Sequence, residues 1–60
     1  MNHEILVVED DEGIREAIAI YLLHAGFHVL QAENGLEGLE VFRKHHPAMA
    51  VVDIMMPEMD

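Results

Sequence analysis

Apolar residues in this chain form short continuous runs that alternate with longer amphipathic stretches. The first run, Ile5–Val8, holds four aliphatic residues with no polar residue between them. Such a run is typical of a strand buried on both faces of a parallel sheet. Residues 27–32 and 49–54 predict a second and a third strand, of which the second is less apolar. We therefore expect three short strands.

The stretch between the first two strands carries an apolar stripe with the period of an α-helix. Its members, at i, i+3, i+4, i+7, i+8 and i+11, are Ile14, Ala17, Ile18, Tyr21, Leu22 and Ala25. This spacing predicts a helix that packs the stripe against the sheet. Asp11 is a candidate N-cap, and Gly26 stands where a left-handed residue commonly ends a helix.

A second helix is expected between the second and third strands. Asn34 followed by Glu37 resembles a capping box, with Asn in place of the usual Ser or Thr. The apolar side of this helix comprises Leu36, Leu39, Val41 and Phe42. Basic residues at 43–45 suit its C-terminal end, and Pro47 prevents its continuation. Gly38 in its interior costs about 1 kcal/mol relative to Ala.

The predicted order of elements is β-α-β-α-β, without a linker or repeat. Helices that alternate with buried strands imply a parallel sheet with right-handed crossovers. The predicted fold class is α/β, one half of a doubly wound parallel sheet.

Composition and charge narrow the possible functions. The 60 residues include 12 acidic and 3 basic side chains, a formal charge of −9, and no cysteine. This charge disfavours binding to nucleic acid or to an anionic membrane surface, and the lack of thiols excludes thiolate-bound zinc. No apolar run is long enough for a membrane helix, and the first residues lack the features of a signal peptide. We expect a cytoplasmic location. The 52% of apolar residues suits a chain that packs against further protein.

Acidic residues lie at or near the ends of two of the predicted strands. Glu9 and Asp10 follow the first strand, and Asp53 lies within the third apolar run. Ligands bind at the carboxyl ends of strands in open parallel sheets, where these carboxylates would converge if the two strands are neighbours. Such carboxylates repel each other unless a cation compensates, and Mg²⁺ suits oxygen ligands of this kind. Favourable interaction with a helix N-terminus is a sufficient explanation for Asp11 and Glu12 but not for Asp53, which is costly to bury without a partner.

Four segments together resemble the receiver domain of bacterial two-component response regulators. They are Ile5–Glu12, Ile14–Glu16, Ala32–Gly35 and Val52–Asp60. The resemblance implies a flavodoxin-like fold with strand order 2-1-3-4-5. Residues 1–60 would form its N-terminal half, with the strand order 2-1-3.

The resemblance also implies a role for individual residues. Asp53 matches the phosphoacceptor that takes a phosphoryl group from a sensor histidine kinase. Asp10 matches a direct Mg²⁺ ligand, Glu9 an acid that acts through a metal-bound water, and Met55 the residue whose backbone carbonyl completes the protein ligands. The module would then control an output domain, expected to be transcriptional, and would not itself be an enzyme.

Two other functional interpretations remain open. The family's fourth strand ends in Ser or Thr and its fifth in Lys, and neither lies in this chain, so the 60 residues could be a truncated or engineered fragment that does not signal. Such a fragment is expected to form a homodimer or a higher assembly, because residues 49–54 would form an unprotected apolar edge. An aspartate-nucleophile phosphatase is more distant, because it would want an acid at the position of Met55.

The remaining features carry less information. The five histidines do not form a helical i, i+4 pair, and we expect them to be solvated. The five methionines are expected to serve packing. Residues 34–38 lack the pattern of a phosphate-binding loop.

Overall fold

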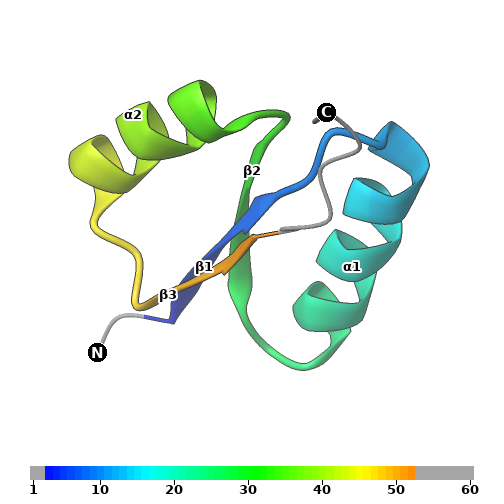
Figure 1. Cartoon of the computed structure of the whole chain (residues 1–60). Coiled ribbons are helices and arrows are strands. Elements are labelled where there is room, and N and C mark those ends of the chain that lie inside the picture. The colour runs from blue at the N-terminus through cyan, green and yellow to red at the C-terminus, as the bar shows by residue number, and fades with distance from the viewer. Residues whose placement is uncertain (1–2, 53–60) are drawn as a thin grey trace.

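Three strands and two helices alternate along the chain, as the hydrophobic pattern predicts. A computed structural model describes residues 3–52. Its elements, shown in Figure 1, are β1 (Glu4–Val8), α1 (Glu12–His24), β2 (His28–Ala32), α2 (Gly35–His45) and β3 (Met49–Val52). The last two residues of the predicted third strand, 53 and 54, lie outside the described residues.

The strands form one parallel sheet in the order β2-β1-β3. In β1, Leu6 pairs with Leu30 of β2 and with Ala50 of β3. The central strand is buried along Ile5–Val8, as expected for a strand covered on both faces. This arrangement confirms the predicted strand order 2-1-3 and the partial flavodoxin-like α/β fold.

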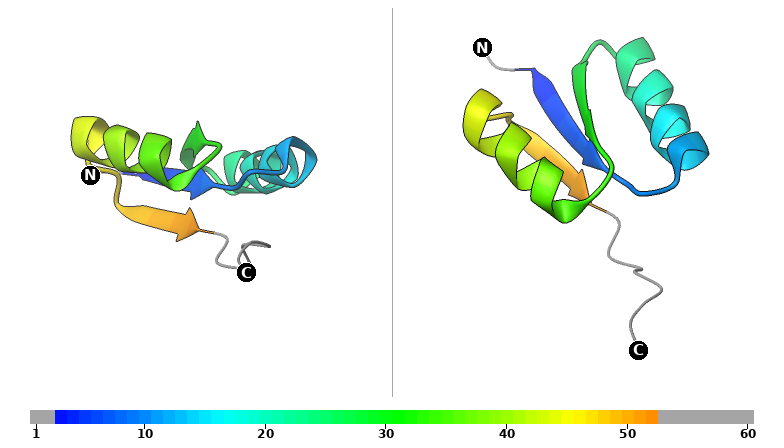
Figure 2. Two further views of the ribbon diagram at one scale, coloured as in Figure 1. Left: turned by 45° about the horizontal axis from the view of Figure 1, so that its top comes forward. Right: turned by 90° about the horizontal axis from the view of Figure 1, so that it is seen from above.

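The two helices cover opposite faces of the sheet, as the two views of Figure 2 show. Leu6 and Val8 form a buried cluster with Ala32, and Val41 of α2 packs against that cluster. Successive residues of a strand point to opposite faces, so the intervening positions of β1 and β2 face α1. Neither helix of the described chain has the length and the apolar content that crossing a bilayer requires.

Local capping defines both ends of α1. Asp11 accepts a hydrogen bond from the Ile14 backbone N–H at 3.0 Å, which confirms Asp11 as the N-cap. After the C-cap residue Ala25, Gly26 has a φ of 98°, in the left-handed region that glycine adopts without strain. The chain then turns directly into β2.

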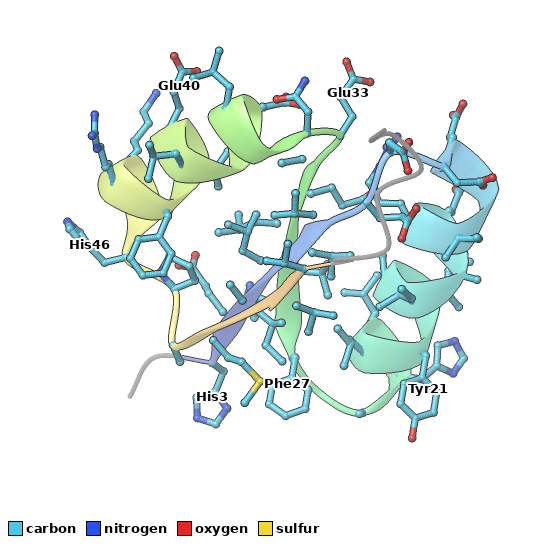
Figure 3. All side chains as sticks on the ribbon, in the orientation of Figure 1. His3, Tyr21, Phe27, Glu33, Glu40 and His46 are labelled. Atoms are coloured by element: carbon cyan, nitrogen blue, oxygen red, sulfur yellow. The ribbon has the colours of Figure 1, made fainter. Side chains whose placement is uncertain are left out.

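The face of α1 that meets the sheet matches the predicted stripe only in part, at Ile18 and Leu22. Ala19 is the buried residue of α1, and its half-buried neighbours are Arg15, Ile18 and Leu22. Four members of the stripe, Ile14, Ala17, Tyr21 and Ala25, are exposed, and Figure 3 shows Tyr21 pointing away from the sheet. Within residues 3–52, α1 contacts only β1 and β2, so no other element covers this flank.

The caps of α2 also agree with the sequence. The Glu37 backbone N–H donates to Asn34 Oδ1 at 2.8 Å. In return, Glu37 Oε1 accepts from the Glu33 N–H at 2.9 Å, one residue earlier than in the usual capping box. At the other end, His46 adopts a left-handed conformation with φ 50° and donates its backbone N–H to Phe42 O. Pro47 follows directly and is buried.

The predicted apolar side of α2 is only partly buried. Gly38 and Val41 face the sheet, whereas Leu36, Leu39 and Phe42 remain exposed. Like α1, α2 contacts β1 and β2 but not β3 among the described elements. An apolar groove of about 190 Å³ lies between α2 and the sheet, and its lining includes Leu39, Phe42 and Val52. The predicted helix is correct, but its apolar side extends beyond the sheet that it covers.

Candidate functional site

The carboxyl ends of the three strands lie at one edge of the sheet, because all of them run parallel. In Figure 3, Glu33 follows β2 at this edge, whereas His3 lies at the opposite edge. Val8, the last residue of β1, pairs with Val52, the last residue of β3. Two strand ends that precede acidic residues are therefore neighbours, as the strand order 2-1-3 implied by the family resemblance requires.

Glu9 is buried at this edge, with 5% of its surface exposed. Its backbone N–H donates to Ala32 O at 3.1 Å, which extends the β1–β2 ladder by one residue. Its carboxylate Oε2 accepts a hydrogen bond from the Asp11 N–H at 3.1 Å. A buried carboxylate requires such donors because burial removes its hydration. The residue is thus held by both β2 and the following loop.

The backbone carbonyl of Glu9 is held by Arg15, in the first turn of α1. Arg15 Nη1 donates to Glu9 O at 2.8 Å, and Arg15 Nε donates to Gln31 Oε1 at 3.2 Å. One guanidinium therefore joins the end of β1 to β2. The hydrophobic and acidic patterns of the sequence do not single out Arg15, although a cation near a helix N-terminus, where the dipole disfavours it, is unusual.

The next acidic residues are more exposed than Glu9. Asp10 lies on the surface immediately after the buried glutamate. Asp11 caps α1, and Glu12 is the acidic residue of its first turn. Both therefore have the helix-terminal role that the sequence suggests, and Glu9 and Asp10 remain as candidate ligands.

Oxygen donors at this edge fit a hard divalent cation. Glu9 and Asp10 supply carboxylates, the ligand type that Mg²⁺ prefers, at the end of a strand. The other two residues of the predicted metal set, Asp53 and Met55, lie outside the described residues. Within residues 3–52, no group of three or more His, Cys, Asp or Glu side chains is arranged to hold a metal ion.

The histidines lie away from these acids in the chain and are exposed, as expected. They are His3, His24, His28, His45 and His46.

Comparison with known proteins gives a family match and several curated relatives. The family model of the response regulator receiver domain matches residues 5–60. The chain is 46% identical over 57 residues to a protein of Pyropia yezoensis named "Probable transcriptional regulator ycf27", covering 95% of this chain and 24% of that protein. It is 46% identical over 56 residues to the transcriptional regulatory protein CseB of Streptomyces avermitilis, covering 93% of this chain and 24% of CseB.

A third relative is matched along the whole of this chain. The transcriptional regulatory protein SrrA of Staphylococcus aureus is 38% identical over 60 residues, which are 100% of this chain and 25% of the relative. The chain thus spans about a quarter of the length of the curated relatives that it matches.

Proposed function

This chain belongs to the response regulator receiver domain family, and we propose on that basis that Asp53 is its phosphoacceptor. Receiver domains are signalling modules of two-component systems. In the proposed reaction a sensor histidine kinase supplies the phosphoryl group. Mg²⁺ would be held by Asp10, Asp53 and the backbone carbonyl of Met55, with Glu9 acting through a metal-bound water.

The pairing register of β1 with β3 is the observation that supports this proposal most strongly. Val8 pairs with Val52, and the peptide bonds that follow lead to Glu9 and Asp53. Adjacent parallel strands lie about 4.8 Å apart, so Val8 and Val52 are neighbours at this edge of the sheet. A cation shared by the acids that follow in the sequence requires two strand ends arranged in this way.

Each side chain has a chemical role in the proposed reaction. An Asp53 carboxylate oxygen attacks the phosphorus of a phosphohistidine, forming the new P–O bond as the P–N bond breaks. The departing electron pair stays on the imidazole nitrogen of the kinase. When bound, Mg²⁺ neutralises charge on the transferring group, which is the main requirement of phosphoryl transfer. Glu9 is held in place by the Asp11 N–H at 3.1 Å and keeps its carboxylate at the edge of the sheet.

The role in a larger protein is part of the proposal. The curated relatives are named as transcriptional regulators and are about four times as long as this chain. We infer a cytoplasmic protein in which phosphorylation of this module controls transcription through a separate output domain. Its net charge of −9 argues against direct contact with nucleic acid by this segment.

Phosphorylation of Asp53 can be tested with a small-molecule phosphodonor. Incubation of the full-length protein that contains this module with phosphoramidate and Mg²⁺ should add one phosphoryl group, detected by intact mass and by hydroxylamine-sensitive labelling of the acyl phosphate. Residues 1–60 alone should be labelled poorly, because they lack the Lys and the Ser or Thr that stabilise phosphoryl oxygens in the family. The Asp53→Asn variant should remain unlabelled. Asp11→Asn is the matched control, because it removes a nearby carboxylate while Asn still caps α1. Labelling of Asp53→Asn at the unaltered rate would refute Asp53 as the acceptor.

A further inference from the structure

Arg15 is the one Lys or Arg side chain at the carboxyl edge of the described sheet. The other two, Arg43 and Lys44, lie in the last turn of α2, beside the start of β3. Around Arg15, the chain carries four consecutive acids at residues 9–12. The guanidinium bridges Glu9 O and Gln31 Oε1, and the residue is half-buried.

The hydrogen bond from Arg15 to Glu9 O restrains the whole peptide unit between Glu9 and Asp10. A peptide unit is planar, so the Glu9 carbonyl and the Asp10 N–H and Cα move together. The Glu9 N–H is already bonded to Ala32 O, and the Arg15 contact of 2.8 Å fixes the opposite side of the residue. Arg15 Nε bonded to Gln31 at 3.2 Å then ties this peptide to β2. These bonds restrain the Glu9–Asp10 peptide from both sides.

We propose that Arg15 is a positioning residue of the acidic site, which orients the Glu9–Asp10 peptide for cation binding without itself contacting the cation. The inference rests on the proposed function of the site, because it concerns how two of its carboxylates are presented. Gln31 of β2 takes part in this positioning, because its Oε1 accepts a hydrogen bond from the Arg15 guanidinium. Outer partners of metal ligands typically change affinity 10- to 100-fold when they are removed.

Removal of the Arg15 charge and loss of its positioning contacts should change the Mg²⁺ affinity in opposite directions. The proposal can therefore be tested. Replacing Arg15 by Gln changes the formal charge from −9 to −10, which by itself favours a cation and should tighten Mg²⁺ binding. Loss of the bridge should loosen it instead. Arg43→Gln makes the same change in charge at the far end of α2, so it serves as the matched control.

The experiment is a Mg²⁺ titration followed by NMR amide shifts, with circular dichroism as the check of folding. Arg15→Gln should weaken Mg²⁺ binding about tenfold, whereas Arg43→Gln should leave it within about twofold. In the metal-free protein, Arg15→Gln should also shift the Asp10 and Asp11 amides, while Arg43→Gln should not. Gln31→Met should weaken binding in the same direction by a smaller factor.

A conservative variant keeps the test decisive if Arg15→Gln does not fold. Arg15→Lys retains the charge, but a single ammonium cannot reproduce the fork that joins Glu9 O to Gln31. It should bind Mg²⁺ with intermediate affinity. Unchanged or tighter Mg²⁺ binding by Arg15→Gln would overturn the positioning role. If Arg15→Gln is unfolded, unchanged Mg²⁺ binding by Arg15→Lys would overturn it instead. Failure of the starting protein to bind Mg²⁺ would instead refute the proposed function, and the metal-free amide shifts would still report on the bridge.

Discussion

Replacing Gly38 by Ala should destabilise the protein, although the change favours the helix. Gly38 lies inside α2 and is buried against β1. A Cβ at this position would lie 2.8 Å from Val8 Cγ2, 3.5 Å from Val8 Cγ1 and 3.8 Å from Ala32 Cβ. Carbon atoms pack best at about 3.5–4.0 Å, so the shortest of these contacts requires α2 or Val8 to move.

The magnitude follows from two opposing effects. Ala gains about 1 kcal/mol over Gly in a helix interior. Overpacking of a tight core site costs about 1–3 kcal/mol, and the close atom belongs to a β-branched side chain that has few alternative rotamers. Val8 is itself 6% exposed and is enclosed by the same core cluster. We therefore expect a net loss of up to about 2 kcal/mol in the free energy of unfolding, a large share for a small domain.

Urea denaturation followed by circular dichroism would measure this effect. Gly35→Ala is the matched control, because a Cβ there meets nothing within 4 Å, and its stability should not fall. The double variant Val8→Ala/Gly38→Ala should lose less free energy of unfolding than the two single variants lose together, by more than about 0.5 kcal/mol. The reason is that Val8→Ala removes the obstructing methyl groups. A Gly38→Ala variant that is as stable as Gly35→Ala would refute the steric explanation.

Three further predictions follow from the caps and from the exposed edge. His46→Gly should stabilise the protein by about 0.5–1 kcal/mol in thermal unfolding, because Gly removes the strain of φ 50° at the end of α2; a lower melting temperature would contradict this. Asn34→Ala should cost about 1 kcal/mol in the same assay through loss of the 2.8 Å bond to the Glu37 N–H, whereas Asn34→Ser should cost little. All of β3 is exposed at an edge of the described sheet, so we expect the chain to dimerise. Val51→Lys should then shift the sedimentation of the protein toward that of a monomer, and a concentration-independent monomer in the starting protein would contradict the expected association.

Local signals predicted the elements of the fold well. Asp11, Gly26 and Asn34 end or begin their helices as expected, because capping depends on residues only a few positions apart. The order 2-1-3 came from the resemblance to a known family, since alternation of elements gives a parallel sheet but no strand order. The helical stripes showed which residues are apolar, but not which element covers them. Tyr21 and Leu36 illustrate this limit, at 75% and 76% exposed.

The candidate site was predictable only in part for the same reason. Glu9 and Asp10 could be selected because they directly follow an apolar strand, at the sheet edge where ligands bind, and because they match residues of a known family. The contact between Arg15 and Gln31 spans 16 residues and depends on how α1 lies against β2. No sequence period reports that geometry.

The position of β1 in the middle of the sheet has a consequence for synthesis of the chain. The strand emerges first, but its partners follow late: His28 pairs with Glu4, and Met49 with Ile5. At about 5–20 residues per second, the run Ile5–Val8 waits on the order of seconds for its second neighbour. An unpaired apolar strand is a template for aggregation, and flanking charges act as gatekeepers against it. We therefore expect the acids at 9–12 to act as gatekeepers for the nascent strand.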